Sequence, residues 1–168
     1  MRVKKTAIWI SLVMKKYIVE ILQKKILPDP IGKAVVKDAH DAGIEGLGAV
    51  RVGRLYRIEG RVSNDNIVAI ASKLLADPIT EDFKIQEVDS PFKKSEHVRR
   101  IEVWFHASVT DTVGETVKIG ISDLGIQDVS RVATGKSYIF AAKITDEQLK
   151  NLAHNVLANT MINKCVFY

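Results

Sequence analysis

Few residues of this sequence have the types and spacing that enzyme chemistry needs. Gly135-Lys136-Ser137 resembles the end of a phosphate-binding loop, in which backbone N–H groups and a lysine hold a phosphate. That loop needs another glycine five residues before the last one, and this position is Ser130. The glycine-rich segment 43–48 has the wrong spacing for a dinucleotide loop and precedes a predicted strand. Turns or helix ends explain both segments better.

Candidate nucleophiles, acid–base groups and metal ligands are equally sparse. Cys165 lies in an apolar closing segment and is interpreted as a small core residue; a single cysteine also excludes a disulfide within the chain. The four histidines lack a metal-ligand spacing, and the acids form no pair that suggests catalysis. Asp29 and Asp111 are predicted to cap helices. We therefore expect no catalytic residue, no metal site and no cofactor bound to this chain.

One cluster of basic and aromatic residues surrounds two glycines on strands that we expect to be accessible at a sheet edge. Arginine and tyrosine are enriched in protein interfaces, so the cluster is predicted to dock a partner protein. The alternative is an ordinary solvated face of a sheet. The residues of the predicted docking surface are Arg51, Gly53, Arg54, Tyr56, Gly135, Lys136 and Tyr138.

The charge distribution argues against nucleic acid and membrane as partners. The 168 residues carry a net charge of +5, but residues 1–16 hold five basic groups and no acid, so the remainder is formally neutral. The apolar run 6–14 is shorter than the roughly 20 residues that span a bilayer. We expect residues 1–13 to be an N-terminal extension, either a flexible arm or sequence that precedes the true start at Met14. A cytoplasmic protein is predicted.

The elements that must position these residues occur twice. When the chain is shifted by 82 residues, residues 17–86 align without gaps on residues 99–168, and 13 of the 70 pairs are identical. Three glycines, a tyrosine and the helix caps fall in register. The domains are therefore predicted as a first repeat over 14–86, a polar linker over 87–98 and a second repeat over 99–168.

Each repeat is predicted to have the order β-α-β-β-α-β. The first helices begin after the caps at Asp29 and Asp111 and end at Gly43 and Gly125. Gly53 and Gly135 are interpreted as turn or bulge residues between two strands, 49–52 and 56–62 in the first copy and 128–134 and 138–144 in the second. The outer strands are predicted over 17–22, 83–85, 100–105 and 164–167. Second helices begin near Ser63 and Thr145.

The composition, with 46% hydrophobic and 27% charged residues, is typical of a folded protein. A repeat of about 70 residues is close to the lower limit for an independent core. We therefore expect an α+β fold in which the two copies pack as a pseudo-dimer, with antiparallel sheets and helices on one face. Strand hydrogen bonding across the seam is a further possibility.

The first repeat resembles the PurS family, the small subunit of phosphoribosylformylglycinamidine synthase. The resemblance covers residues 14–86. It is carried by Leu27-Pro28-Asp29-Pro30 with Gly32, by Gly43, by the VRVGR segment 50–54, and by the LLADPI segment 74–79 with Glu81-Asp82. The second repeat keeps Asp111, Gly114, Gly125, Gly135-Lys136 and the LAN segment 157–159, but it lacks the three prolines.

The resemblance implies a non-catalytic bridging subunit of an ATP-dependent carbon–nitrogen ligase in de novo purine (IMP) biosynthesis. Its expected partners are a PurL-type synthetase, which would use ATP and Mg²⁺, and a PurQ-type glutaminase, which would supply ammonia. A tandem chain is similar to a fused PurS dimer, and a further homodimer is possible. The alternative hypothesis is a small-ligand regulatory module, in which Asp29 and Gly32 line a pocket.

Overall fold

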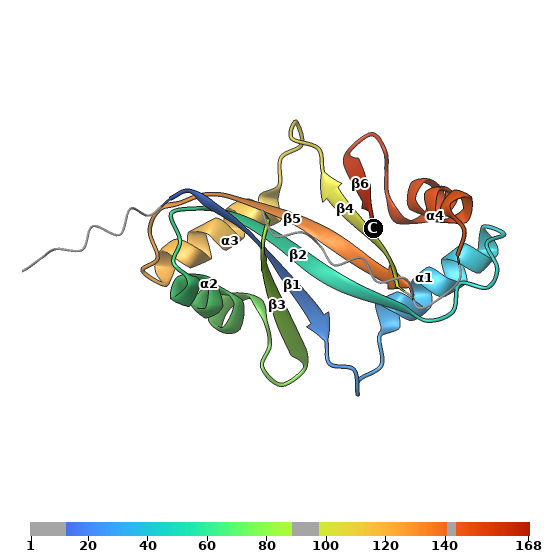
Figure 1. Ribbon diagram of the computed structural model, residues 1–168, viewed down its shortest axis with the longest axis horizontal. Coiled ribbons are helices and arrows are strands. Elements are labelled where there is room, and N and C mark those ends of the chain that lie inside the picture. The colour runs from blue at the N-terminus through green and yellow to red at the C-terminus, as the bar shows by residue number, and fades with distance from the viewer. Residues whose placement is uncertain (1–12, 89–97, 141–143) are drawn as a thin grey trace, which may run out of the picture.

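The computed structural model describes residues 13–88, 98–140 and 144–168 (Figure 1). The predicted extension 1–13 and linker 87–98 lie almost entirely outside the described residues, as do residues 141–143 of the predicted strand 138–144. Repeat 1 consists of β1 (Lys15–Gln23), α1 (Pro30–Asp41), β2 (Val50–Gly60), α2 (Asn64–Ile70) and β3 (Glu81–Glu87). Repeat 2 consists of β4 (Arg99–Phe105), α3 (Thr112–Asp123), β5 (Val129–Phe140), α4 (Asp146–Leu152) and β6 (Asn163–Phe167). A π-helical turn extends α2 over Ala71–Leu75 and α4 over Ala153–Leu157.

The order within each repeat is β-α-β-α-β, which corrects the prediction of two strands separated by a glycine turn or bulge. Gly53 and Gly135 lie inside the continuous strands β2 and β5. The physical reason is crowding from neighbouring strands. A Cβ at Gly53 would lie 2.6 Å from the Ser137 Oγ, and one at Gly135 would lie 2.7 Å from the Trp104 ring. These glycines make room for side chains rather than turning the chain.

All six strands form a single antiparallel sheet in the order β3-β1-β2-β5-β4-β6. The two repeats meet where β2 pairs with β5, which confirms strand hydrogen bonding across the seam. Arg54 lies opposite Lys136 in this pairing, and these two residues are also equivalent positions of the repeat. A pseudo-twofold axis therefore passes between them, as in a symmetric dimer.

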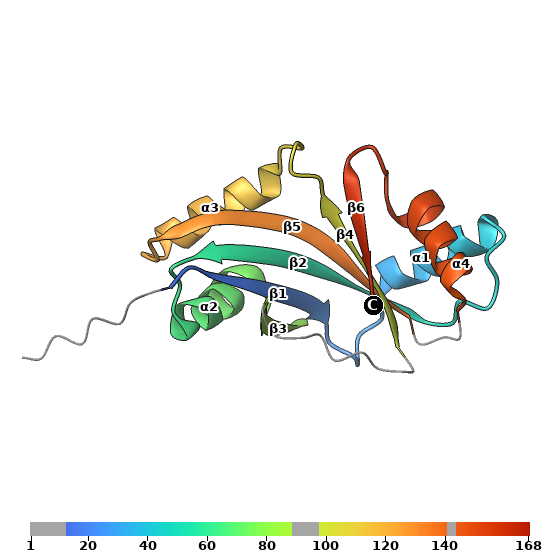
Figure 2. The same ribbon diagram turned by 45° about the horizontal axis from the view of Figure 1, so that its top comes forward.

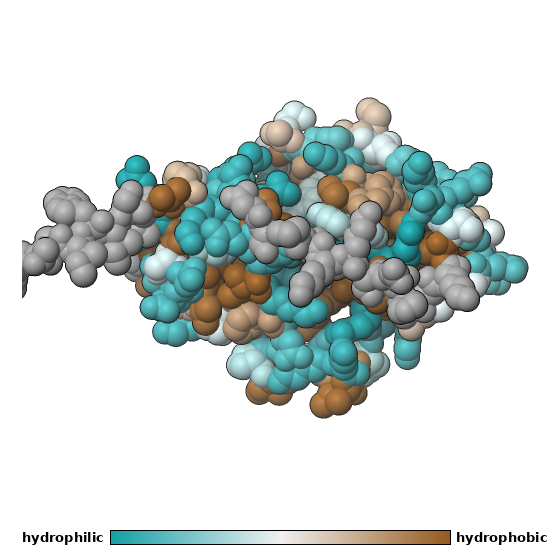
Figure 3. Space-filling model, viewed as in Figure 1, coloured by the Kyte–Doolittle hydropathy of each residue, from teal (hydrophilic) through white to brown (hydrophobic). Residues whose placement is uncertain are grey.

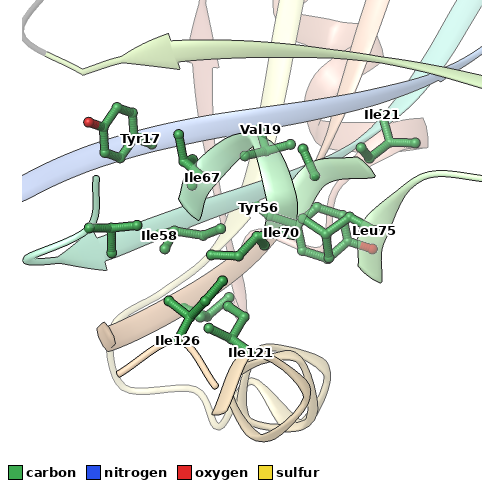
Figure 4. Packing of buried hydrophobic residues seen from close by; sticks show 13 residues of the cluster. Tyr17, Val19, Ile21, Tyr56, Ile58, Ile67, Ile70, Leu75, Ile121 and Ile126 are labelled. Atoms are coloured by element: carbon green, nitrogen blue, oxygen red, sulfur yellow. The ribbon is translucent and has the colours of Figure 1, made fainter. Parts of the chain in front are cut away.

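The four helices cover one face of this sheet and exchange partners between the repeats. Figure 2 shows α2 and α3 toward one end of the curved sheet and α1 and α4 toward the other. In the first hydrophobic core, α2 packs with α3 over β1 and β2; Figure 4 shows Tyr17, Val19, Tyr56, Ile58, Ile67, Ile70 and Ile121 in this cluster. In the second core, α1 packs with α4; its members include Val35, Ala39, Phe140, Leu149 and Leu152.

This exchange makes each core a joint product of both repeats. The first helix of each repeat contributes to the core that contains the other repeat's second helix. Burial of aliphatic side chains is the main stabilising contribution to such a fold. A single repeat would leave part of each core exposed, so the pseudo-dimer is the folding unit.

The two predicted capping residues, Asp29 and Asp111, begin their helices and also connect them to the seam strands β2 and β5. Asp29 accepts the Gly32 N–H at 2.7 Å, and its second oxygen accepts the Val52 N–H of β2 at 2.9 Å. Asp111 repeats this arrangement with Gly114 at 2.8 Å and with Thr134 of β5 at 2.5 Å. Each carboxylate thus serves a helix end and a strand N–H group that would otherwise lack a partner. Among the described residues, no helix is both long and apolar enough to cross a membrane.

Candidate functional site: the seam between the repeats

The seven residues of the predicted docking surface do not form one surface. They lie on β2 and β5, which are the central strands of the sheet and not accessible edges. Since successive side chains of a strand point to opposite faces, the set is divided. Arg54, Tyr56, Lys136 and Tyr138 are on the helix-covered face, while Arg51, Gly53 and Gly135 are on the opposite face.

On the face opposite the helices, a buried polar network joins the two repeats. The Arg100 guanidinium on β4 donates to Glu20 of β1 at 2.8 Å and to Glu102 at 2.8 and 3.0 Å. Glu20 also accepts the Ser137 hydroxyl of β5 at 2.5 Å. The second oxygen of Glu102 accepts the Trp104 indole N–H at 2.9 Å. Because Glu20, Glu102, Arg100 and Ser137 are all buried, these bonds form in a setting of low polarity.

Gly53 explains how Glu20 reaches across an intervening strand. β2 lies between β1 and β5, and Gly53 of β2 pairs with Ser137 on one side and Leu22 on the other. The Ser137 Oγ occupies the space where a side chain at this position would stand. On the next strand, Trp104 covers Gly135, and the Arg57 guanidinium lies 4.4 Å from the Trp104 ring centre. The two glycines therefore leave the space that the polar network occupies. We call this network of Glu20, Arg100, Glu102, Ser137 and Trp104 the seam clamp.

Sequence reasoning missed this network, although it identified both glycines. The available signal was a single glutamate within an apolar strand in each copy, Glu20 in YIVEIL and Glu102 in RIEVWF. Buried carboxylates require a hydrogen-bonded partner. That partner, Arg100, has the apolar Ile18 as its equivalent in repeat 1, so the register of the repeat gave no indication of it.

The chemistry open to the described part of the chain is limited. The network's carboxylates are held by internal donors, and no three His, Cys, Asp or Glu side chains of this part gather as metal ligands. Cys165 packs beside the second core, and burial raises the pKa of its thiol, which opposes nucleophilic attack. Among the histidines, the His106 ring lies 3.3 Å from the Thr160 carbonyl.

The pocket of the alternative hypothesis exists as a hollow but offers no free carboxylate. Asp29 and Gly32 line a hollow of about 230 Å³ at the start of α1. Both oxygens of Asp29 accept backbone N–H groups, from Gly32 and Val52. Asp29 therefore serves the fold at this place. Ligand binding there stays a prediction.

Comparison with known proteins assigns the family. A sequence model of the PurS family, described as phosphoribosylformylglycinamidine (FGAM) synthase, matches residues 16–89 and again residues 98–168. This chain belongs to the PurS family. The double match confirms the tandem repeat, and each match contains one β-α-β-α-β unit.

A single-repeat relative supports the same assignment. The "Phosphoribosylformylglycinamidine synthase subunit PurS" of Synechocystis sp. is 34% identical over 87 residues; the match covers 87% of that protein and 47% of this chain. The PurS chain described here is thus a subunit of FGAM synthase, an enzyme of purine biosynthesis, and acts together with partner subunits.

Proposed function

We propose that this PurS chain bridges the PurL-type synthetase and the PurQ-type glutaminase of FGAM synthase in the cytoplasm. The glutaminase releases ammonia from glutamine. The synthetase uses ATP and Mg²⁺ to activate the substrate amide oxygen, which ammonia then displaces. Holding the two sites at a fixed separation prevents the loss of ammonia to solvent, which is an effect of proximity. The observation that carries the proposal is the single sheet through both repeats, which makes a rigid body with two related but unlike halves.

The opposite edges of the sheet offer the two contact points that a bridge needs. Edge strands β3 and β6 follow the loops 76–80 and 158–162, which point away from each other (Figure 1). Ile79 is 79% exposed and Met161 is 85% exposed at the tips of these loops, and they are equivalent positions of the repeat. Figure 3 shows hydrophobic residues protruding at the lower and upper edges, where these loops lie. Their equivalent positions in the two halves would give each partner a similar apolar contact point at the end of a rigid support.

The loops are held in a fixed shape by matching hydrogen bonds. The Ile79 N–H donates to the Asp77 carboxylate at 2.7 Å, and the Met161 N–H donates to the Asn159 side chain at 3.0 Å. A preorganised loop loses little conformational entropy when it binds. On the helix-covered face of the seam, Tyr56 and Tyr138 are buried, so these two side chains offer little area to a partner. We therefore assign docking to the loop tips, and docking by the seven seam residues stays a prediction.

A reconstitution with all three subunits tests the bridge. Turnover is measured with glutamine and, in parallel, with an ammonium salt as the nitrogen source. Omitting this chain is expected to abolish glutamine-dependent turnover and to leave ammonia-dependent turnover of the synthetase in place. Full glutamine-dependent turnover in its absence would refute the proposal.

Charged substitutions at the loop tips test the contact points separately. Ile79→Asp and Met161→Asp are each expected to lose retention of one partner in copurification with glutamine and nucleotide. The control is Ile119→Asp, which changes an exposed residue on α3 away from both loops. Retention of both partners by both variants would remove the loops from the interface, while the turnover experiment would still decide whether the chain is a bridge.

A further inference from the structure

Lys136 lies on the seam strand β5, next to the pseudo-twofold axis of the sheet. On the helix-covered face it lies directly opposite Arg54, and two like charges in this position repel each other. Arg54 is neutralised by Glu81, whose two oxygens lie 2.7 and 2.8 Å from the guanidinium. Within the ranges 13–88, 98–140 and 144–168, Lys136 has neither a hydrogen bond nor an ion pair through its ammonium group.

The difference between the repeats has a single cause at position 163. The equivalent of Glu81 in repeat 2 is Asn163. Both side chains accept the N–H that begins the loop, Glu81 from Asp77 at 3.0 Å and Asn163 from Asn159 at 3.1 Å. The backbone role of the acid is therefore preserved in repeat 2, whereas its charge is absent. In repeat 1 the group beside the equivalent cation, Arg54, is the carboxylate of Glu81. A carboxylate therefore also suits the position beside Lys136.

Asn163 and Lys136 line a hollow of about 360 Å³. Its polar members include Lys136, Arg54 and Asn163, and its apolar members include Phe105, Val113 and Leu157. This volume lies within the range of small-molecule sites, which are mostly apolar with a few polar groups that orient the ligand. This lining suits a ligand that has one anionic end and a short apolar body.

We propose that this hollow binds a free small carboxylate with an apolar body, whose carboxylate pairs with Lys136 as Glu81 pairs with Arg54. A bound carboxylate neutralises Lys136, as Glu81 already neutralises Arg54, and so removes the repulsion at the pseudo-twofold axis. This site goes beyond the bridging role, since it needs no partner subunit and lies away from the loop tips. In the full chain, a metabolite bound in this hollow would contact β2 and β5, the two strands that join the repeats.

Isocaproate and its neutral amide, isocaproamide, are the matched probes. The full chain is titrated with each, and amide chemical shifts are followed by NMR. Isocaproate is expected to give saturable shifts at Gly135, Lys136 and Asn163 with a Kd on the order of 1 mM. The amide has the same shape without the charge and is expected to bind about tenfold more weakly or not at all.

Three variants locate the binding. Lys136→Gln removes the cation and Asn163→Glu restores the internal carboxylate, so each is expected to abolish the shifts. Lys164→Gln is the control, because this lysine is adjacent to Asn163 but points to the opposite face of β6. It is expected to bind as the unchanged chain does. The proposal is overturned by equal binding of the amide, by binding that survives in both Lys136→Gln and Asn163→Glu, or by the absence of saturable shifts in the unchanged chain.

Discussion

Replacing Arg100 by methionine tests whether the buried network clamps the seam. Arg100→Met keeps much of the side-chain volume and removes three charge-assisted hydrogen bonds, to Glu20 and Glu102. Among the described residues, the donors that then remain to the two buried carboxylates are the Ser137 hydroxyl and the Trp104 indole. Removing one partner of a buried ion pair typically costs about 3–5 kcal/mol, because the remaining charge stays buried without compensation. That is a large part of the roughly 5–15 kcal/mol that stabilises a domain.

Urea unfolding followed by circular dichroism measures this loss. With a denaturant slope of about 2 kcal/mol per molar, the midpoint is expected to fall by about 2 M. Arg131→Met is the matched control, because Arg131 is exposed on the seam strand β5; its effect should stay within about 0.5 kcal/mol. Adding Glu20→Gln and Glu102→Gln to Arg100→Met removes the stranded charges and should recover more than half of the loss. A loss below about 1 kcal/mol for Arg100→Met would refute the clamp.

Three further predictions concern single residues. Gly53→Ala places a Cβ 2.6 Å from the Ser137 Oγ and should destabilise the fold by about 1–3 kcal/mol in the same urea assay. Asp111→Ala removes the cap of α3 and leaves the Thr134 N–H without its acceptor; a loss of about 2–4 kcal/mol is expected by thermal unfolding, with Asp111→Asn intermediate. Burial raises the pKa of Cys165, so less of this thiol is ionised at a given pH; its iodoacetamide alkylation should be slower than that of free cysteine and reach its midpoint at higher pH.

The features that the sequence predicted correctly are those set by local chemistry. The helix starts at Asp29 and Asp111 follow from a side chain that caps its own helix. The ends at Gly43 and Gly125 follow from backbone angles φ of 78° and 77°, which glycine adopts with little strain. The shift of 82 residues preserves all of these signals, so the tandem organisation follows from the order of the amino acids alone.

The features that it predicted wrongly depend on residues distant in sequence. Gly53 and Gly135 have the local character of turns, and only the positions of Ser137 and Trp104 show why a strand contains them. The expectation that the docking residues lie on accessible edge strands was also wrong, because pairing between the repeats makes β2 and β5 the central strands of the sheet. Docking by these residues stays a prediction. No local signal in the sequence indicates that the first helix of each repeat packs in the same core as the second helix of the other repeat.

The fusion of two repeats into one chain explains how the two halves can differ on each face of the seam. In a dimer of identical chains, each substitution appears twice about the axis, so a favourable change on one side also acts on the other. Here Arg100 has Ile18 as its equivalent, and one guanidinium serves the carboxylates of both copies. On the other face, repeat 2 has Asn163 where repeat 1 has Glu81, so the carboxylate that pairs with Arg54 has no equivalent beside Lys136. A tandem chain can therefore keep the shared sheet of a dimer while its halves diverge, which suits the proposed contact with two unlike partners.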